Sequence, residues 1–164
     1  MSDPIIVVMG VSGCGKTTIA KLLSEKTKIP FFDADDFHPK ENVDKMSNGI
    51  PLKDEDRIPW LMALNAKMKQ QVTNKGIVLA CSALKERYRE ILNKGIYYVH
   101  WVYLEGDFET VKHRIEQREG HFMGVDLLKS QFDCLEEPTY GIKVNINQTP
   151  DEVLDYIIKS TIEV

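Results

Sequence analysis

Residues 5–17 read IIVVMGVSGCGKT, and this stretch decides the fold. Its first five residues form a short, continuous apolar run that ends at a glycine, which is typical of a strand buried on both faces of a parallel sheet. The remainder, Gly10 to Thr17, fits the pattern G-x-x-x-x-G-K-[ST], which binds phosphate when it follows a strand and opens a helix. Residues 16–26 have the apolar spacing of such a helix. The stretch therefore predicts a nucleotide-binding loop between a buried strand and a helix.

The residue types in this loop suit a phosphate ligand. Its glycines let backbone N–H groups turn inward around phosphate oxygens, and the N-terminus of the helix adds unpaired donors and partial positive charge. Lys16 is expected to reach the β- and γ-phosphates of ATP, and Thr17 to offer its hydroxyl to Mg²⁺. A glycine turn without a ligand is the alternative, but the agreement of pattern and context argues against it. We therefore predict ATP contacts along the loop, from Gly10, Val11, Ser12, Gly13, Cys14, Gly15, Lys16, Thr17 and Thr18.

Apolar β-branched runs alternate with amphipathic stretches along the rest of the chain. Further strands are expected at 30–32, 77–81, 97–104 and 142–146, and helices at about 39–47, 54–72, 84–93, 108–118, 125–136 and from 150 onward. Asp54 or Asp56 is expected to cap the third helix, and Thr149 with Glu152 forms a capping box before the last one. This β-α-β order predicts a single α/β domain over 1–164, with a doubly wound parallel five-stranded sheet and helices on both faces.

Composition excludes several classes of protein. The 164 residues are 43% hydrophobic and 28% charged, which is ordinary for a globular protein. The net charge of −4 and the absence of a Lys/Arg block argue against nucleic acid as a partner. No apolar run approaches the roughly 18 residues of a membrane span, and the first residues lack the pattern of a secretory signal. Three scattered cysteines, Cys14, Cys81 and Cys134, have no metal-binding spacing and are expected to be free thiols in the cytoplasm.

The motifs outside the loop favour a small-molecule kinase. The guanine-reading Asn-Lys-x-Asp pattern of GTPases is missing, because Asn-Lys at 74–75 and at 93–94 is followed each time by Gly-Ile. A kinase has to exclude water from the transferring phosphate, which calls for a mobile lid that carries cations. Arg114 and Arg118 share one helix face and precede the segment 120–124, which has a glycine at each end. We expect a lid over about 114–136, and a solvated ion-pair helix is the alternative.

Two carboxylates follow the second expected strand. Strand C-termini in an open parallel sheet face the ligand crevice, so Asp33 and Asp35 are expected there. Strand alternation would point both side chains the same way. One carboxylate can orient an attacking hydroxyl or accept its proton, and the other can help to hold Mg²⁺. The alternative is that Asp35 or Asp36 only caps the next helix.

Three more side chains are candidates for contact with an anionic substrate. Arg57 can clamp a carboxylate with two hydrogen bonds, or it can pair with the acidic run at 54–56. Lys85 follows the third expected strand, at the edge of the crevice, and is either an anion ligand or a solvated lysine. His38, taken alone, is more often a loop histidine than a ligand.

Four segments resemble the gluconokinase family of P-loop carbohydrate kinases, which are relatives of shikimate kinase and the nucleoside monophosphate kinases. They are MGVSGCGKTT at 9–18, DADDFHPKENVDKMSNGIPLKDEDRIPWL at 33–61, CSALKERYR at 81–89 and GHFMGVDLLKSQFDCLEEP at 120–138. The similarity runs over essentially the whole chain, and the 33–61 block is far more selective than the phosphate loop. The resemblance implies that ATP, with Mg²⁺, phosphorylates D-gluconate at its 6-hydroxyl to give 6-phospho-D-gluconate and ADP. It also implies a P-loop nucleoside-kinase-like fold and a homodimer.

The resemblance assigns roles by position. ATP and metal fall to Gly13, Gly15, Lys16 and Thr17, with Arg114 in the lid and Gln148 near the adenine; Asp33 stays the metal contact expected from its place after the second strand. Substrate contacts fall to Asp35 at the 6-hydroxyl, His38 at the polyol, Arg57, Lys85 and the lid residue His121. Lys16, Asp35, Arg57 and the lid residue Arg118 form the expected catalytic set.

The chain departs from the family pattern at two positions, and two alternatives to gluconate phosphorylation stay open. Cys14 stands where serine is frequent, and its side chain is expected to point away from the phosphates. Gly124 stands where many members have proline, which bears on the stiffness of the lid. A kinase for another small acid such as shikimate is one alternative, against which the 33–61 block speaks. A regulatory module that binds nucleotide without transferring phosphate is the other.

Overall fold

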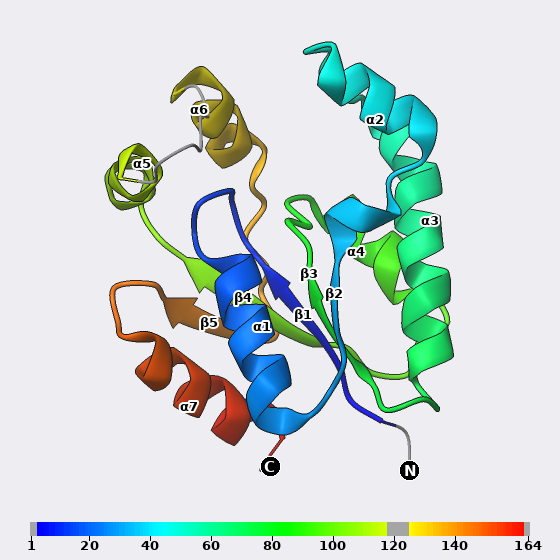
Figure 1. Cartoon of the computed structure of the whole chain (residues 1–164), viewed down its shortest axis with the longest axis vertical. Helices are drawn as coiled ribbons and strands as arrows, with labels where there is room; N and C mark the ends of the chain where they lie inside the picture. The colour runs from blue at the N-terminus through cyan, green and yellow to red at the C-terminus, as the bar shows by residue number, and fades with distance from the viewer. Residues whose placement is uncertain (1–2, 118–124, 163–164) are drawn as a thin grey trace.

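The computed structural model describes residues 3–117 and 125–162. Five strands form one sheet in the order β2-β3-β1-β4-β5, and each neighbouring pair is parallel (Figure 1). The strands are β1 (Ile5–Met9), β2 (Phe31–Asp33), β3 (Ile77–Ala80), β4 (His100–Glu105) and β5 (Ile142–Asn145). The predicted parallel five-stranded sheet is therefore confirmed.

Helices cover both faces of this sheet, which confirms the doubly wound arrangement (Figure 1). They are α1 (Lys16–Thr27), the 3₁₀ helix η1 (Ala34–Phe37), α2 (Lys40–Ser47), α3 (Asp54–Gln71), α4 (Glu86–Asn93), α5 (Phe108–Glu116), α6 (Val125–Cys134) and α7 (Pro150–Thr161). Over the described ranges, none of these helices is both long and apolar enough for a membrane crossing.

The central strand β1 shows why its sequence is apolar without interruption. Ile6 and Val8 pack into one core with buried residues of α1, α5, α6 and α7. Ile5, Val7 and Met9 pack on the opposite face with buried residues of α3 and α4. Because both faces of the strand are buried, alternation between apolar and polar residues disappears.

The helix caps follow the sequence in one case and depart from it in another. At α7, the Glu152 N–H donates to Thr149 Oγ1 over 3.2 Å and the Thr149 N–H donates to Glu152 Oε1 over 3.2 Å, so the capping box is confirmed. At α3, the prediction that an aspartate is the N-cap is wrong, because Lys53 occupies that position. The Asp56 carboxylate, at N3, accepts from the Lys53 N–H over 2.9 Å. Asp54 is left free for the contacts described below.

Strand β4 begins three residues later than its sequence predicts. The aromatic and β-branched run from residue 97 favours a strand, yet β4 starts at His100, which pairs with Ile6. The neighbouring strand β1 itself starts at Ile5, so the residues before His100 have almost no strand to pair with. Tyr97 is 100% exposed and Tyr98 is 61% exposed as a result.

Candidate active site

The phosphate loop joins β1 to α1 at the carboxyl edge of the sheet. In the strand order, β1 lies between β3 and β4, and the crevice at such a reversal point is where open α/β sheets bind ligands. Gly13 and Gly15 have φ values of 82° and 98°, which L side chains rarely adopt. Gly15 is also the N-cap of α1 and brings no side chain to cap it, so the first N–H groups of the helix stay available to an anion. The loop therefore fits the phosphates of a nucleotide.

Two side chains of the loop point in different directions. The Lys16 ammonium folds back along the loop and donates to the Val11 carbonyl oxygen over 3.0 Å. Cys14 is 1% exposed and belongs to the core beneath the loop, so its thiol faces away from a phosphate ligand, as the sequence predicts. Burial raises the pKa of this thiol, which keeps it protonated and uncharged.

Replacing Gly13 with alanine is expected to lower the free energy of unfolding. A Cβ at this position would lie 2.6 Å from Ile115 Cγ1, which is inside the core. Such overpacking costs about 1–3 kcal/mol, in addition to the strain of a positive φ. Gly49→Ala is the matched control, because Gly49 has a φ of 71° and nothing within 4 Å of the added Cβ. Urea unfolding of both variants measures the difference, and equal destabilisation would show that Ile115 moves aside at no cost.

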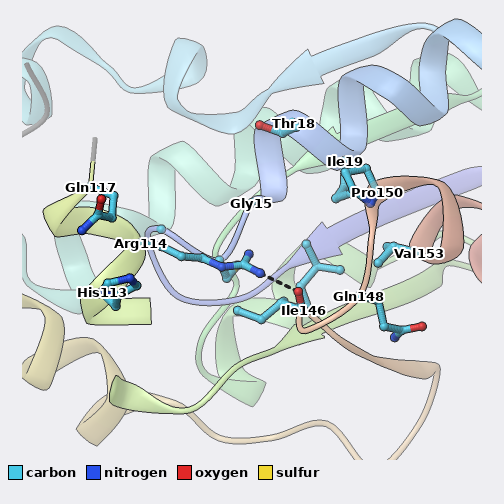
Figure 2. Close-up of a pocket in the computed structure, with 13 residues that line it drawn as sticks. Gly15, Thr18, Ile19, His113, Arg114, Gln117, Ile146, Gln148, Pro150 and Val153 are labelled. Atoms are coloured by element: carbon cyan, nitrogen blue, oxygen red, sulfur yellow. Dashed lines mark hydrogen bonds between the residues drawn. The ribbon is translucent and has the colours of Figure 1, made fainter. Parts of the chain in front are cut away.

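A pocket of about 430 Å³ opens beside the loop (Figure 2). Its walls are Gly13, Cys14, Gly15, Thr18, Ile19, Leu104, His113, Arg114, Gln117, Ile146, Gln148, Pro150 and Val153. Apolar side chains from α1, β4 and α7 give it surfaces suited to a flat base. The Arg114 guanidinium crosses from α5 and donates to the Ile146 carbonyl oxygen over 2.6 Å. The structure thus brings together the two residues that the sequence assigned to nucleotide, Arg114 and Gln148, in one pocket.

Asp33, the last residue of β2, and Asp35 do not have the relation that the sequence predicts. Strand alternation does not relate them, because β2 ends at Asp33 and the 3₁₀ helix η1 begins at the next residue. Asp33 is the N-cap of η1, and its Oδ1 accepts from the Asp35 N–H over 2.9 Å. The idea that Asp35 or Asp36 caps the following helix is also wrong, since the N-cap of α2 is Pro39. Asp35 is left without a capping role.

The Asp35 carboxyl is poised to hold a proton. The residue as a whole is exposed, but neighbouring protein atoms remove part of the hydration of its carboxyl. This burial raises its pKa above the ordinary value, and the nearby charge of Asp33 adds to the rise. Lys16 and His38 are close enough to oppose the shift. A carboxylate of raised pKa beside the lysine of a phosphate loop is suited to accept a proton from a hydroxyl.

His38 is fixed by packing and by one amide. Its ring stacks on Trp60 with centroids 4.2 Å apart and planes inclined by 14°. The Asn42 amide nitrogen donates to the Asp56 carbonyl oxygen over 2.8 Å and lies 3.2 Å from His38 Nδ1. Because that nitrogen can only donate, Nδ1 accepts, and the proton of a neutral ring sits on Nε2. Burial lowers the pKa of His38, which favours this neutral form.

A cluster of cations surrounds Asp54 at the start of α3. Its Oδ1 lies 3.4 Å from Lys85 Nζ and 3.9 Å from Arg57 Nη1, and its Oδ2 lies 3.5 Å from Arg87 Nη1. The Tyr88 hydroxyl donates to Oδ1 over 2.6 Å, and the Arg57 and Lys85 cations both lie 5.6 Å from the Tyr88 ring centroid. We call Asp54, Arg57, Lys85, Arg87 and Tyr88 the acceptor cluster. Its three cations outnumber its one carboxylate, so the cluster attracts an anion.

Some of the site residues predicted from the sequence lie together in the structure, and others fall outside the described residues. Arg57 and Lys85, which are 28 residues apart by number, meet in the acceptor cluster. The alternative pairing of Arg57 with the acidic run at 54–56 is present as its contact with Asp54, whereas the contribution of Tyr88 was not predicted. Arg118 and His121, assigned to the lid, lie outside the described residues, as does Gly124.

The metal prediction rests on Thr17 and Asp33. Thr17 is exposed in the first turn of α1, next to the phosphate loop. Over 3–117 and 125–162, no three His, Cys, Asp or Glu side chains form a cluster that could hold a metal. Mg²⁺ suits such a place, because it is usually held by one or two protein groups together with substrate phosphates and water. The residues present therefore fit Mg²⁺ bound with a nucleotide.

Comparisons with known proteins agree with this chemistry. The family model described as shikimate kinase matches residues 12–160. The thermosensitive gluconokinase of Escherichia coli strain K12 is 50% identical over 152 residues, which cover 90% of this chain and 81% of that protein. A crystal structure of a gluconokinase from Sinorhizobium meliloti 1021 superposes with a TM-score of 0.85 at 37% identity, covering 96% of this chain and 90% of that one.

More distant similarity extends to the shared fold alone. A shikimate kinase structure from Aquifex aeolicus superposes with a TM-score of 0.60 at 21% identity, covering 94% of each chain. The stronger similarity is to gluconokinases, and it covers at least four fifths of both this chain and the compared proteins. The chain therefore belongs to the gluconokinase family, within the wider group that the shikimate kinase family model describes.

Proposed function

We propose that this protein transfers the γ-phosphoryl group of ATP to the 6-hydroxyl of D-gluconate, giving 6-phospho-D-gluconate and ADP. The observation that carries the proposal is that three functional groups follow three neighbouring parallel strands. Lys16 of the phosphate loop follows β1, Asp35 follows β2 and Lys85 of the acceptor cluster follows β3, and these strands are adjacent in the sheet. Because the carboxyl ends of parallel strands share one edge of a sheet, a phosphate site, a proton acceptor and a set of cations border one crevice, as an acceptor with a hydroxyl at one end and a carboxylate at the other requires.

The transfer is an in-line displacement that this chain promotes by placement and charge. Asp35 orients the 6-hydroxyl and accepts its proton as the new O–P bond forms and the bond to the leaving ADP oxygen breaks. Lys16 leaves the Val11 carbonyl and neutralises charge that spreads over the γ-phosphoryl oxygens. Thr17 and Asp33 would hold Mg²⁺, which supplies positive charge to the β- and γ-phosphate oxygens when bound.

The acceptor cluster and His38 account for the choice of a sugar acid. Arg57 and Lys85 offer the cations that a gluconate carboxylate needs, and glucose has no matching charge. The neutral His38 ring presents its Nε2–H as a donor to a hydroxyl of the polyol. The proposal therefore includes a strong preference for gluconate over glucose.

A coupled assay of ADP release tests the proposed function. The acceptors are gluconate, glucose, shikimate and AMP, with a reaction lacking any acceptor as the control. Turnover with gluconate alone is the expected result. Turnover with shikimate instead would replace the substrate while keeping the ATP site. Silence with every acceptor, together with measurable ATP binding, would identify a regulatory module.

The acid limb of the pH profile reports on Asp35. Its deprotonated form is the active one, and its pKa in the folded protein is raised above the ordinary aspartate value. Activity is therefore expected to be full above the raised pKa and to fall as the pH drops through it, at a higher pH than for an ordinary aspartate. A profile of kcat/KM for gluconate against pH measures this midpoint. A limb at or below the ordinary aspartate pKa would contradict an Asp35 base.

We also propose that the chain is one domain with a lid over about 114–136, to which Arg118 and His121 contribute. The protein is further proposed to be a homodimer in the cytoplasm. The homodimer and the lid roles rest on the family resemblance. The cytoplasm is supported by Cys14, Cys81 and Cys134, all free thiols, which suit a reducing compartment. Sedimentation analysis tests the dimer, and a monomer at all concentrations would contradict it.

A further inference from the structure

A glutamine of α6, Gln131, forms two hydrogen bonds with Ser12 of the phosphate loop. Gln131 Oε1 accepts from the Ser12 backbone N–H over 2.7 Å, and Gln131 Nε2 donates to the Ser12 hydroxyl oxygen over 2.9 Å. The two residues are 119 positions apart in sequence. One side-chain amide therefore satisfies both a backbone donor and a side-chain oxygen of the same loop residue, which fixes position and orientation together.

Gln131 is held on a firm base. On the same helix, Leu128 is 1% exposed and belongs to the core that also contains Val11 and Cys14 of the loop. The Phe132 ring meets the Phe108 ring of α5 edge to face, with centroids 5.6 Å apart. Gln131 lies within the proposed lid range, but the packing of Leu128 and Phe132 anchors its helix to the core on both sides of it, so the amide can hold the loop rather than follow it.

Ser12 lies outside the lining of the pocket beside the loop. That pocket is lined by Gly13, Cys14 and Gly15 but not by Ser12. Lys16, which is proposed to serve the β- and γ-phosphates, donates to the carbonyl of Val11, the neighbour of Ser12. Gln131 therefore holds the loop outside the pocket proposed for the base, beside the residue that the Lys16 ammonium contacts.

We propose that Gln131 is a positioning residue for the γ-phosphate: it acts through Ser12 and fixes the terminal-phosphate end of the loop. The inference rests on ATP being the phosphoryl donor of the proposed function, but not on the identity of the acceptor. Gln131 is thus a third residue with a proposed role in the 120–138 region, besides Arg118 and His121 of the lid. If it positions the γ-phosphate, it contributes to the binding of ATP and to phosphoryl transfer but not to the binding of ADP.

The test compares Gln131→Leu with Gln70→Leu. Leucine has a similar size and removes both hydrogen bonds, while Gln70 is exposed on α3 and contacts Lys67 over 3.2 Å, remote from the loop. Dissociation constants for ADP and for a non-hydrolysable ATP analogue are measured by calorimetry, and kcat and KM for ATP by ADP release. Losing two ordinary hydrogen bonds should weaken binding of the analogue about 10-fold in Gln131→Leu and leave ADP binding near wild type.

A double-variant cycle separates positioning from simple bracing. Ser12→Ala keeps the N–H but removes the hydroxyl partner, so its effect on analogue binding should combine with that of Gln131→Leu less than additively. Equal weakening of ADP and analogue, or a lowered Tm with unchanged binding of both, would overturn the proposal and leave Gln131 as a structural brace. Because both binding measurements omit the acceptor, they stand even if gluconate is not the substrate.

Discussion

Asp35→Asn is expected to lower kcat for gluconate phosphorylation by about 10²–10⁴-fold, the usual contribution of a positioned base. Asparagine preserves the shape of the side chain and can still contact the 6-hydroxyl, but it cannot accept the proton. The Asp33 carboxylate accepts from the backbone N–H of residue 35, which the substitution leaves in place, so η1 should keep its conformation. Steady-state kinetics should show KM for ATP close to wild type, because the phosphate loop is untouched.

Asp36→Asn is the matched control for this variant. Asp36 is the next residue in η1, is exposed and carries the same charge. A purely electrostatic effect of removing one negative charge near the crevice would appear in both variants. A kcat that survives in Asp35→Asn, or that falls equally in Asp36→Asn, would reject Asp35 as the base.

Arg57→Ala is expected to raise KM for gluconate roughly 30-fold while leaving KM for ATP unchanged. Loss of one partner from a buried charge pair costs about 2–5 kcal/mol, and the lower end applies because the Arg57 side chain is 31% exposed. The fold should tolerate the change, since Asp54 keeps Lys85, Arg87 and the Tyr88 hydroxyl as partners. Arg57→Lys should recover only part of the loss if the guanidinium binds the carboxylate with two hydrogen bonds.

Arg87→Ala supplies the comparison within the same cluster. Arg87 also pairs with Asp54, over 3.5 Å, but its side chain is 59% exposed, whereas that of Arg57 is 31% exposed and lies against the Tyr88 ring. We expect a small effect on KM for gluconate. If Arg57→Ala is equally mild, Arg57 is only a surface ion pair and the carboxylate site lies elsewhere.

Much of the architecture could be predicted because it depends on local pattern. The buried run of β1, the glycines of the phosphate loop and the capping box at Thr149 each act over a few residues, and each is present as expected. The start of β4 could not be predicted in the same way. The residues from Tyr97 have strand propensity, but a strand needs a neighbour, and β1 starts too late to provide one.

The individual side chains of the site could be predicted from the sequence, but the contacts between them could not. Arg57 and Lys85 are recognisable cations near expected helix and strand ends, yet their meeting depends on Tyr88 and Asp54, which are 34 positions apart. Local pattern cannot set such a distance, because it results from the packing of α3 against α4. The role of Gln131 could not be predicted for the same reason, because its partner Ser12 is 119 positions away in the sequence.

The two ends of the crevice are encoded in separate parts of the gene product. Apart from the phosphate loop and the lid residue His121, the proposed acceptor residues fall between Asp33 and Tyr88, while the pocket residues beyond α1 fall between Leu104 and Val153. Exchanging the contiguous stretch from Asp33 to Tyr88 would therefore leave the pocket residues beyond α1 unchanged. Laboratory evolution toward other anionic polyols can thus begin with about a third of the chain and leave the use of ATP intact.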